Sequence, residues 1–262
     1  MQQGDWVIFV YFCPQINCMA KSVNPYKDSE LSKKAQVEQM FDNISNRYDG
    51  LNRVISLGID QKWRRKVVNL VVDHKPKTVL DIATGTGDLA IAFAQRMDQA
   101  KVTGLDISDG MLSVARKKTA SASFADRLEF VKADSEAMPY PDNHFDAITV
   151  SFGIRNFENL EKGLAEILRV LKPGGLFVVL ETSVPEKFPY KQGYKFYSKG
   201  ILPLIGKLFS KDKVAYGYLS ESAAAFPYGE RLNNIFAKIG FKETENKPQT
   251  FGVATIYTAT KA

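Results

Sequence analysis

The feature that most constrains the fold is a short apolar strand that runs directly into a glycine-rich turn. Residues 78–83 read Thr-Val-Leu-Asp-Ile-Ala, and residues 84–88 read Thr-Gly-Thr-Gly-Asp. A continuous apolar strand is typical of a parallel sheet that helices cover on both faces. A second such strand is predicted over 102–107, with helices over 88–97 and 109–119. The sequence therefore predicts an α/β fold.

The same alternation of strand and helix continues to residue 181. Three further strands are predicted, over 128–134, 145–151 and 176–181. The intervening helix, 158–171, should end at Lys172-Pro173-Gly174-Gly175, because proline and glycine stop helices. Alternation of this length predicts a doubly wound, mostly parallel sheet. Outside this region, helices are predicted over 30–48, 60–73 and 228–239, and a final strand or hairpin over 251–260.

The chain is predicted to form one domain over residues 19–262. A helical lid is expected over 29–73, and an insertion over 184–218 follows the fifth strand. Residues 1–18 look unlike the rest, and Met19 followed by Ala-Lys-Ser is an ordinary protein start. We therefore expect 1–18 to be a non-native or disordered extension.

Composition excludes several kinds of site. The 262 residues include only two cysteines, Cys13 and Cys18, and two histidines, His74 and His144. These numbers support neither a disulfide framework nor a histidine-rich metal centre, so no metal is expected. The net charge of +6 is too small and scattered to indicate a nucleic-acid partner. No apolar run approaches the roughly 20 residues of a membrane-spanning helix, and a cytoplasmic protein is expected.

The chemistry is expected at the turn after the first strand. In a doubly wound sheet, ligands bind beyond the carboxyl ends of the strands. Gly85 and Gly87 let a ligand approach the backbone, and Asp106 is placed to accept hydrogen bonds from both hydroxyls of a ribose. Residues 85–90 also fit the pattern G-x-G-x-x-A, so a nicotinamide nucleotide is an alternative. A second alternative is that Asp106 only caps the next helix.

Later motifs favour a different nucleotide. Asp134 and Ser135 end the third strand, where an acid can meet an adenine amino group. With the segment 139–146 and the motif at 171–175, they resemble the Class I S-adenosylmethionine-dependent methyltransferases. A dehydrogenase is not expected to carry this later set.

A closer resemblance covers residues 24–261. It rests on Tyr48-Asp49-x-x-Asn52-x-x-x-Ser56-x-Gly58, Trp63-Arg64, Asp81-Ile-Ala-Thr-Gly-Thr-Gly-Asp88 and Ser151-Phe-Gly-Ile-Arg-Asn156. With these motifs the chain resembles the ubiquinone/menaquinone biosynthesis C-methyltransferase family, which methylates a ring carbon of a polyprenylated quinol or phenol. The resemblance implies a Rossmann-like, mostly parallel seven-stranded sheet with an antiparallel last strand. It also implies S-adenosyl-L-methionine as cofactor and demethylmenaquinol, or the ubiquinone-pathway benzoquinol, as substrate.

The resemblance assigns contacts with the cofactor to residues at the ends of four strands. Besides the glycines of the turn, these are Thr86, Asp106, Asp134, Ser135 and Ser151. Other Class I methyltransferases that act on a small lipid or phenol remain an alternative, as does a nucleotide-binding scaffold with a decayed site.

The reaction requires stabilisation of a phenolate-like oxygen next to the ring carbon. Arg155 is permanently cationic and lies just past the fourth strand, so we expect it to stabilise this oxyanion, and Asn156 to orient the quinol oxygens. The alternative for Arg155 is a loop ion pair. Tyr48, Asp49 and Asn52 are expected to close over the site, or else simply to pack within the lid.

The insertion 184–218 is rich in aromatic residues and lysines around the apolar run Ile201-Leu-Pro-Leu-Ile205. A polyprenyl tail is confined to bilayers, and this composition suits peripheral contact with the inner face of the cell membrane. The alternatives are a helical lid over the site and a homodimer contact.

Overall fold

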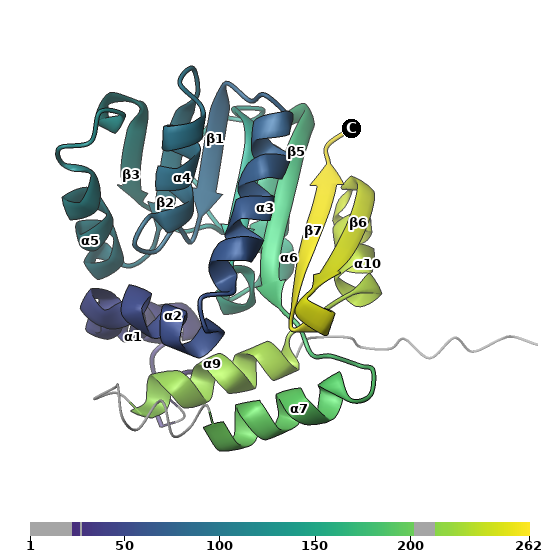
Figure 1. Ribbon diagram of the computed structural model, residues 1–262. Coiled ribbons are helices and arrows are strands. Elements are labelled where there is room, and N and C mark those ends of the chain that lie inside the picture. Colours follow the sequence, from purple (N-terminus) through teal and green to yellow (C-terminus); the bar gives the residue numbers. More distant parts are fainter. Residues whose placement is uncertain (1–22, 27, 202–212) are drawn as a thin grey trace, which may run out of the picture.

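The computed structural model describes residues 23–26, 28–201 and 213–262, and at its centre is a seven-stranded sheet (Figure 1). The strands lie in the order β3-β2-β1-β4-β5-β7-β6. Their bounds are β1 Thr78–Ile82, β2 Lys101–Asp106, β3 Leu128–Lys132, β4 Phe145–Ser151, β5 Leu171–Thr182, β6 Lys242–Gln249 and β7 Ala254–Thr260. Strands β1 to β5 pair in parallel, whereas β7 is antiparallel to β5 and to β6. The predicted mostly parallel sheet with an antiparallel last strand is confirmed.

Five of the described helices cover the two faces of the sheet (Figure 1). One face carries α3 Asp60–Asp73, α4 Asp88–Arg96 and α5 Asp109–Thr119, and the other carries α6 Leu160–Val170 and α10 Glu230–Ile239. Side-chain caps fix two of the helix starts, because a polar oxygen there accepts from an otherwise unpaired N–H group. Ser108 Oγ accepts from Met111 N at α5, and Asn159 Oδ1 accepts from Lys162 N at α6.

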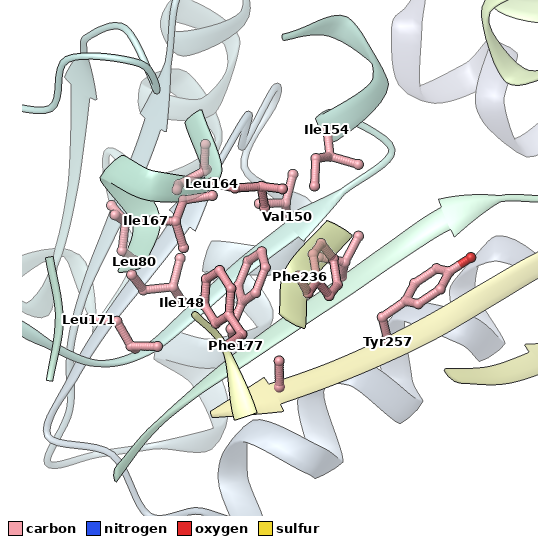
Figure 2. Close-up of a cluster of buried hydrophobic side chains, with 14 of the residues drawn as sticks. Leu80, Ile148, Val150, Ile154, Leu164, Ile167, Leu171, Phe177, Phe236 and Tyr257 are labelled. Carbon is pink, nitrogen blue, oxygen red and sulfur yellow. The ribbon is translucent and has the colours of Figure 1, made fainter. Parts of the chain in front are cut away.

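Each face of the sheet has its own apolar core. On the face of α6 and α10, Ile148 and Phe177 of the sheet pack with Ile167 and Phe236 of the helices (Figure 2). On the opposite face the core contains residues of α3, α4 and the same central strands. Neighbouring strand residues point to opposite faces, so the central strands are buried on both sides. These two cores fix the positions of the strand ends that carry the site.

In the described part of the chain, four helices lie beyond the carboxyl ends of the parallel strands (Figure 1). They are α1 Lys33–Ile44, α2 Tyr48–Ser56, α7 Tyr190–Phe196 and α9 Lys213–Ala225. The single helix predicted over 30–48 is wrong in extent, because a 3-10 turn, η1 Ser45–Arg47, separates α1 from α2. At this break Ser45 Oγ donates to the carbonyl of Asp42 at 3.0 Å. Further short helical turns are η2 Ala125–Arg127, η3 Ile154–Asn156, η4 Tyr197–Ile201 and η5 Thr250–Gly252.

Two strands differ from the prediction. β6 was not expected, because its sequence KETENKPQ is polar and mostly exposed at the sheet edge, where proline is tolerated. β5 begins at Leu171 instead of 176, with an irregularity in its pairing to β4 at the proline-glycine motif. The helix α6 nevertheless ends at Val170, as that motif predicted.

Some expectations fall on residues that the structure does not describe. The extension 1–18, with both cysteines, lies outside the described residues, as does the part of the apolar run from residue 202 to 205. Within the described ranges, no helix has the length and apolar character needed to cross a membrane.

Candidate active site

A cleft of about 700 Å³ lies at the carboxyl ends of β1, β2 and β4. The sheet supplies its floor through residues that follow these strands, and α1 covers it with Lys34, Val37 and Phe41. Seven of the residues expected to form the site line this cleft: Tyr48, Gly85, Asp106, Asp134, Ser135, Ser151 and Asn156.

Asp106 anchors the turn that follows β1. Its Oδ2 accepts from Gly85 N at 2.8 Å and its Oδ1 accepts from Ser108 N at 2.9 Å. Gly85 has a φ of +59°, a left-handed conformation that favours glycine. Burial raises the pKa of the Asp106 carboxyl to about 6, although the backbone N–H groups favour the ionised form. At pH 7 this side chain is an anion with lone pairs left to accept from a ligand in the cleft.

Asp134 and Ser135 form the opposite wall of the cleft. Asp134 Oδ1 accepts from Glu136 N at 2.9 Å, and its Oδ2 accepts from Lys34 Nζ at 2.9 Å. Lys34 lies on α1, so this ion pair joins α1 to the segment that follows β3. The expected adenine contact of Asp134 therefore shares its carboxylate with a lid lysine.

Ser151 carries a polar atom without a partner in the described part of the chain. Its Oγ is sealed from solvent and makes no hydrogen bond, although it ends β4 at the wall of the cleft. A buried hydroxyl without a partner is costly, and a ligand in the cleft would relieve that cost. The free hydroxyl and the Asp106 carboxylate in this cleft together fit S-adenosylmethionine.

Four of the expected residues, besides Arg155, do not line this cleft. Thr86 Oγ1 donates to Asp49 Oδ1 at 2.5 Å, and Asp49 Oδ2 also pairs with Lys118 Nζ at 2.5 Å. This cluster ties α2 to the turn after β1. Gly87 has a packing role, because a Cβ at this position would lie 2.9 Å from Cζ of Phe130. Asn52 lies on α2 and does not line the cleft.

Arg155 and Asn156 differ in their access to the cleft. Arg155 is 8% exposed and its Nη1 pairs with Glu181 Oε1, so the guanidinium is buried beside a carboxylate and does not line the cleft. Burial lowers the pKa of Arg155, but the combined attraction of Glu181, Tyr48 and Tyr218 and the hydrogen bond to Glu181 outweigh it, so the net shift is upward. Asn156 lines the cleft, and its Oδ1 accepts from the hydroxyl of Tyr218 on α9 at 3.0 Å.

The sequence did not predict the side chains that pair with Arg155 and Asn156. Glu181 is the second-last residue of β5, 26 positions after Arg155, and Tyr218 lies 62 positions after Asn156. Glu181 is a charged residue at the end of an apolar strand, and that exception to the pattern was a usable signal. Tyr218 belongs to a segment with several tyrosines, so nothing in the sequence distinguishes it.

Comparisons with known proteins agree with this geometry. A model of the ubiE/COQ5 methyltransferase family matches residues 29–261. The demethylmenaquinone methyltransferase of Bacteroides fragilis is 46% identical over 246 residues, which are 94% of this chain and 100% of that protein. The ubiquinone/menaquinone biosynthesis C-methyltransferase UbiE of Geobacter sulfurreducens is 43% identical over 246 residues, covering 94% and 95%.

Solved structures share the fold at lower identity. The cyclase SpnF matches with a TM-score of 0.61 at 20% identity, over 87% of this chain and 96% of that one. A SAM-dependent methyltransferase from Aquifex aeolicus matches with a TM-score of 0.54 at 17% identity, over 74% and 89%. At these identities the likeness concerns the fold alone, whereas the family model spans nearly the whole described chain. The chain belongs to the ubiE/COQ5 methyltransferase family.

Proposed function

We propose that this protein transfers the methyl group of S-adenosylmethionine to a ring carbon of demethylmenaquinol, which yields menaquinol. The observation that carries the proposal is the 46% identity to a demethylmenaquinone methyltransferase over that protein's full length. Family membership confirms the expected class of enzyme and decides against the nicotinamide alternative for the glycine-rich turn.

The residues of the cleft fit the demands of methyl transfer. S-adenosylmethionine, when bound, supplies a methyl group that is already an activated electrophile. Asp106 would accept hydrogen bonds from the ribose hydroxyls, and Asp134, Ser135 and Ser151 would bind the rest of the nucleoside. α1 lines the cleft with Lys34, Val37 and Phe41, and by limiting the access of water it would strengthen each of these interactions.

Asn156 is the better placed of the two expected catalytic residues for contact with the quinol. It lines the cleft, and because its Oδ1 accepts from Tyr218, its amide N–H groups are the part available to a substrate oxygen. We assign Arg155 an electrostatic role: its charge, held next to the cleft lining by Glu181, would stabilise the oxyanion without contact with the quinol. Donors fixed in advance stabilise an oxyanion without reorganisation during the reaction.

An assay with a labelled methyl donor tests the proposal. Reduced demethylmenaquinone should accept the label, and the Asn156→Ala variant should transfer it about 100-fold more slowly while binding S-adenosylhomocysteine with unchanged affinity. Binding of S-adenosylhomocysteine without transfer to the naphthoquinol would contradict the proposed substrate. Transfer only to the benzenoid quinol would reassign the enzyme to the ubiquinone-type substrate.

We also propose that the start of the insertion contacts a membrane surface. Phe188 and Phe196 are 79% and 70% exposed, and the neighbouring lysines at 187, 191 and 195 are exposed as well. Their spacing of four residues brings Lys191 and Lys195 to one side of α7. The segment adjoins the lid, because the Tyr197 hydroxyl donates to the carbonyl of Ile55 at 2.5 Å. A quinol with a polyprenyl tail would enter from a bilayer at this end of the sheet.

Flotation with anionic vesicles tests the membrane contact. Each surface lysine contributes about 1 kcal/mol of attraction to an anionic membrane, so neutralising three should weaken partitioning about 100-fold. The test variant is K187Q/K191Q/K195Q. The matched control is K75Q/K77Q/K101Q, whose exposed lysines lie at the amino ends of β1 and β2. Equal flotation of both variants, with sedimentation as a dimer, would favour the homodimer contact instead.

A further inference from the structure

The start of α1 contacts two different walls of the cleft. Ser32 caps this helix, since its Oγ accepts from Ala35 N at 3.3 Å, and the first two helical residues are lysines. Lys34 Nζ donates to Asp134 Oδ2 after β3, whereas Lys33 Nζ reaches the segment after β4. Consecutive residues of a helix point in different directions, so these two side chains can reach separate walls. Lys33 therefore ties α1 to the β4 side of the cleft.

Lys33 holds the turn that carries Asn156. Its Nζ donates to the carbonyl oxygens of Arg155 at 3.1 Å and of Phe157 at 2.8 Å. These carbonyls lie at the end of η3, where a helical backbone leaves acceptors without partners and a lysine can satisfy them. Asn156 is the residue between them. The two hydrogen bonds from one ammonium therefore fix the backbone on both sides of Asn156.

The surroundings of Lys33 favour this role over a surface ion pair. The side chain is half-buried, and its hydrogen-bond partners in the described chain are the two backbone carbonyls. Burial lowers the pKa of the Lys33 ammonium by more than the charges of Glu158 and Glu136 raise it. Taking an ammonium out of water is costly unless its N–H groups find acceptors. Here the acceptors belong to the turn, so the contacts of Lys33 are directed at the turn.

We propose that Lys33 is a positioning residue for methyl transfer, which holds Asn156 at the wall of the cleft while α1 lies over it. The inference rests on the proposed function, and Lys33 itself does not line the cleft. Tyr218 fixes the side chain of Asn156 from α9, and Lys33 fixes its backbone from α1. An amide donor held from two sides is arranged in advance for the developing oxyanion. Displacement of α1 would remove the backbone anchor, so the donor is in place only under α1.

Single-turnover transfer from a labelled methyl donor to reduced demethylmenaquinone tests this assignment. Lys33→Met keeps an unbranched side chain with high helix propensity and removes its donors. It should slow transfer about 10-fold to 100-fold, because a small misplacement of a group at the reacting centre has an effect of this size, while S-adenosylhomocysteine binds with unchanged affinity. Lys33→Arg keeps a cation with several N–H donors and should transfer within about threefold of the unsubstituted protein. The matched control Lys117→Met alters an exposed lysine of α5 and should change neither quantity.

A double-variant cycle tests whether Lys33 acts through Asn156. If it does, K33M should slow the N156A protein by no more than about threefold, because the group that Lys33 positions is already gone. A general loosening of α1 would instead multiply with N156A and slow it by a further factor of about 10 to 100, which would overturn the proposal. Unchanged transfer in K33M, Lys33→Arg as slow as K33M, or weaker binding of S-adenosylhomocysteine that accounts for the slower transfer would overturn it as well.

Hydrogen exchange separates failure of this inference from failure of the proposed function. The amides of Asn156 and Phe157 donate to the carbonyls of Gly153 and Ile154, and K33M should make both amides exchange faster, with α6 unchanged as the internal reference. This measurement needs no substrate. If the unsubstituted protein transfers no methyl group to the quinol, the proposed substrate is wrong, whereas faster exchange would still support the hold of Lys33 on the turn. Unchanged exchange at these two amides would overturn the inference whatever the substrate.

Discussion

Replacement of Glu181 by glutamine should destabilise the protein, because it leaves the buried positive charge of Arg155 without its anionic partner. Glu181 is 1% exposed and Arg155 is 8% exposed, so neither charge is solvated by water. Glu181 Oε1 also accepts from Thr182 N at 2.7 Å, and a glutamine oxygen preserves that bond. The substitution therefore removes the charge and little else. Breaking a buried pair in this way costs about 3–5 kcal/mol of unfolding free energy.

The double variant R155M/E181Q identifies the cause. With the guanidinium also gone, no uncompensated charge remains, so this variant should be more stable than E181Q alone by about 2 kcal/mol or more. Urea unfolding followed by circular dichroism measures both differences. The matched control is Glu161→Gln, which breaks an exposed pair with Lys238 and should cost about 0.5 kcal/mol or less. A loss below about 1 kcal/mol in E181Q, or a double variant less stable than E181Q, would refute the reasoning.

Three further predictions concern the cleft and its lid. Because burial holds the pKa of Asp106 at about 6, the affinity for S-adenosylhomocysteine should fall as the pH drops below 6. Asp106→Asn should reduce the slope of log affinity against pH by about one. Titration calorimetry measures both profiles, and parallel profiles for the two proteins would contradict this prediction. Asp49→Asn should weaken the tie of α2 to Thr86 and Lys118, so amides of residues 48–56 should exchange hydrogen faster, with α4 unaffected as the internal reference. Gly153→Ala places a Cβ very close to the Cβ of Ala83 and should lower the free energy of unfolding in urea by about 1–3 kcal/mol. The double variant A83G/G153A should restore most of this stability, because it removes the Ala83 Cβ and because a glycine suits the φ of +52° at position 83. A double variant as unstable as Gly153→Ala would reject the steric explanation.

Residues that act through local geometry were predictable from the chain alone. The apolar run 78–83, the turn at 84–88 and the acid at 106 depend on neighbours a few positions away and on the period of a buried strand. They led to the doubly wound sheet and to the cleft at its carboxyl edge. Tyr48, Asp134, Ser135, Ser151 and Asn156 were expected at the site and do line the cleft. Their roles toward cofactor and substrate stay predictions.

Polar segments were harder to predict, because they carry no apolar period. The edge strand β6 has exposed side chains on much of its length, so no alternation reveals it. Likewise, the break at Ser45 depends on a hydroxyl that bonds to the backbone of Asp42, and helical spacing of the apolar residues continues through it.

The sequence by itself determined the order of strands and helices, the glycine turn and the acid beside it, because each follows from short-range periodicity and backbone freedom. Tertiary structure alone decided which charges meet. Arg155 pairs with Glu181, Asp49 with Lys118, and Lys34 with Asp134. These contacts join residues far apart in the chain, and no period encodes them. They arise only when the cores on both faces fix the strand ends and the lid helices against one another.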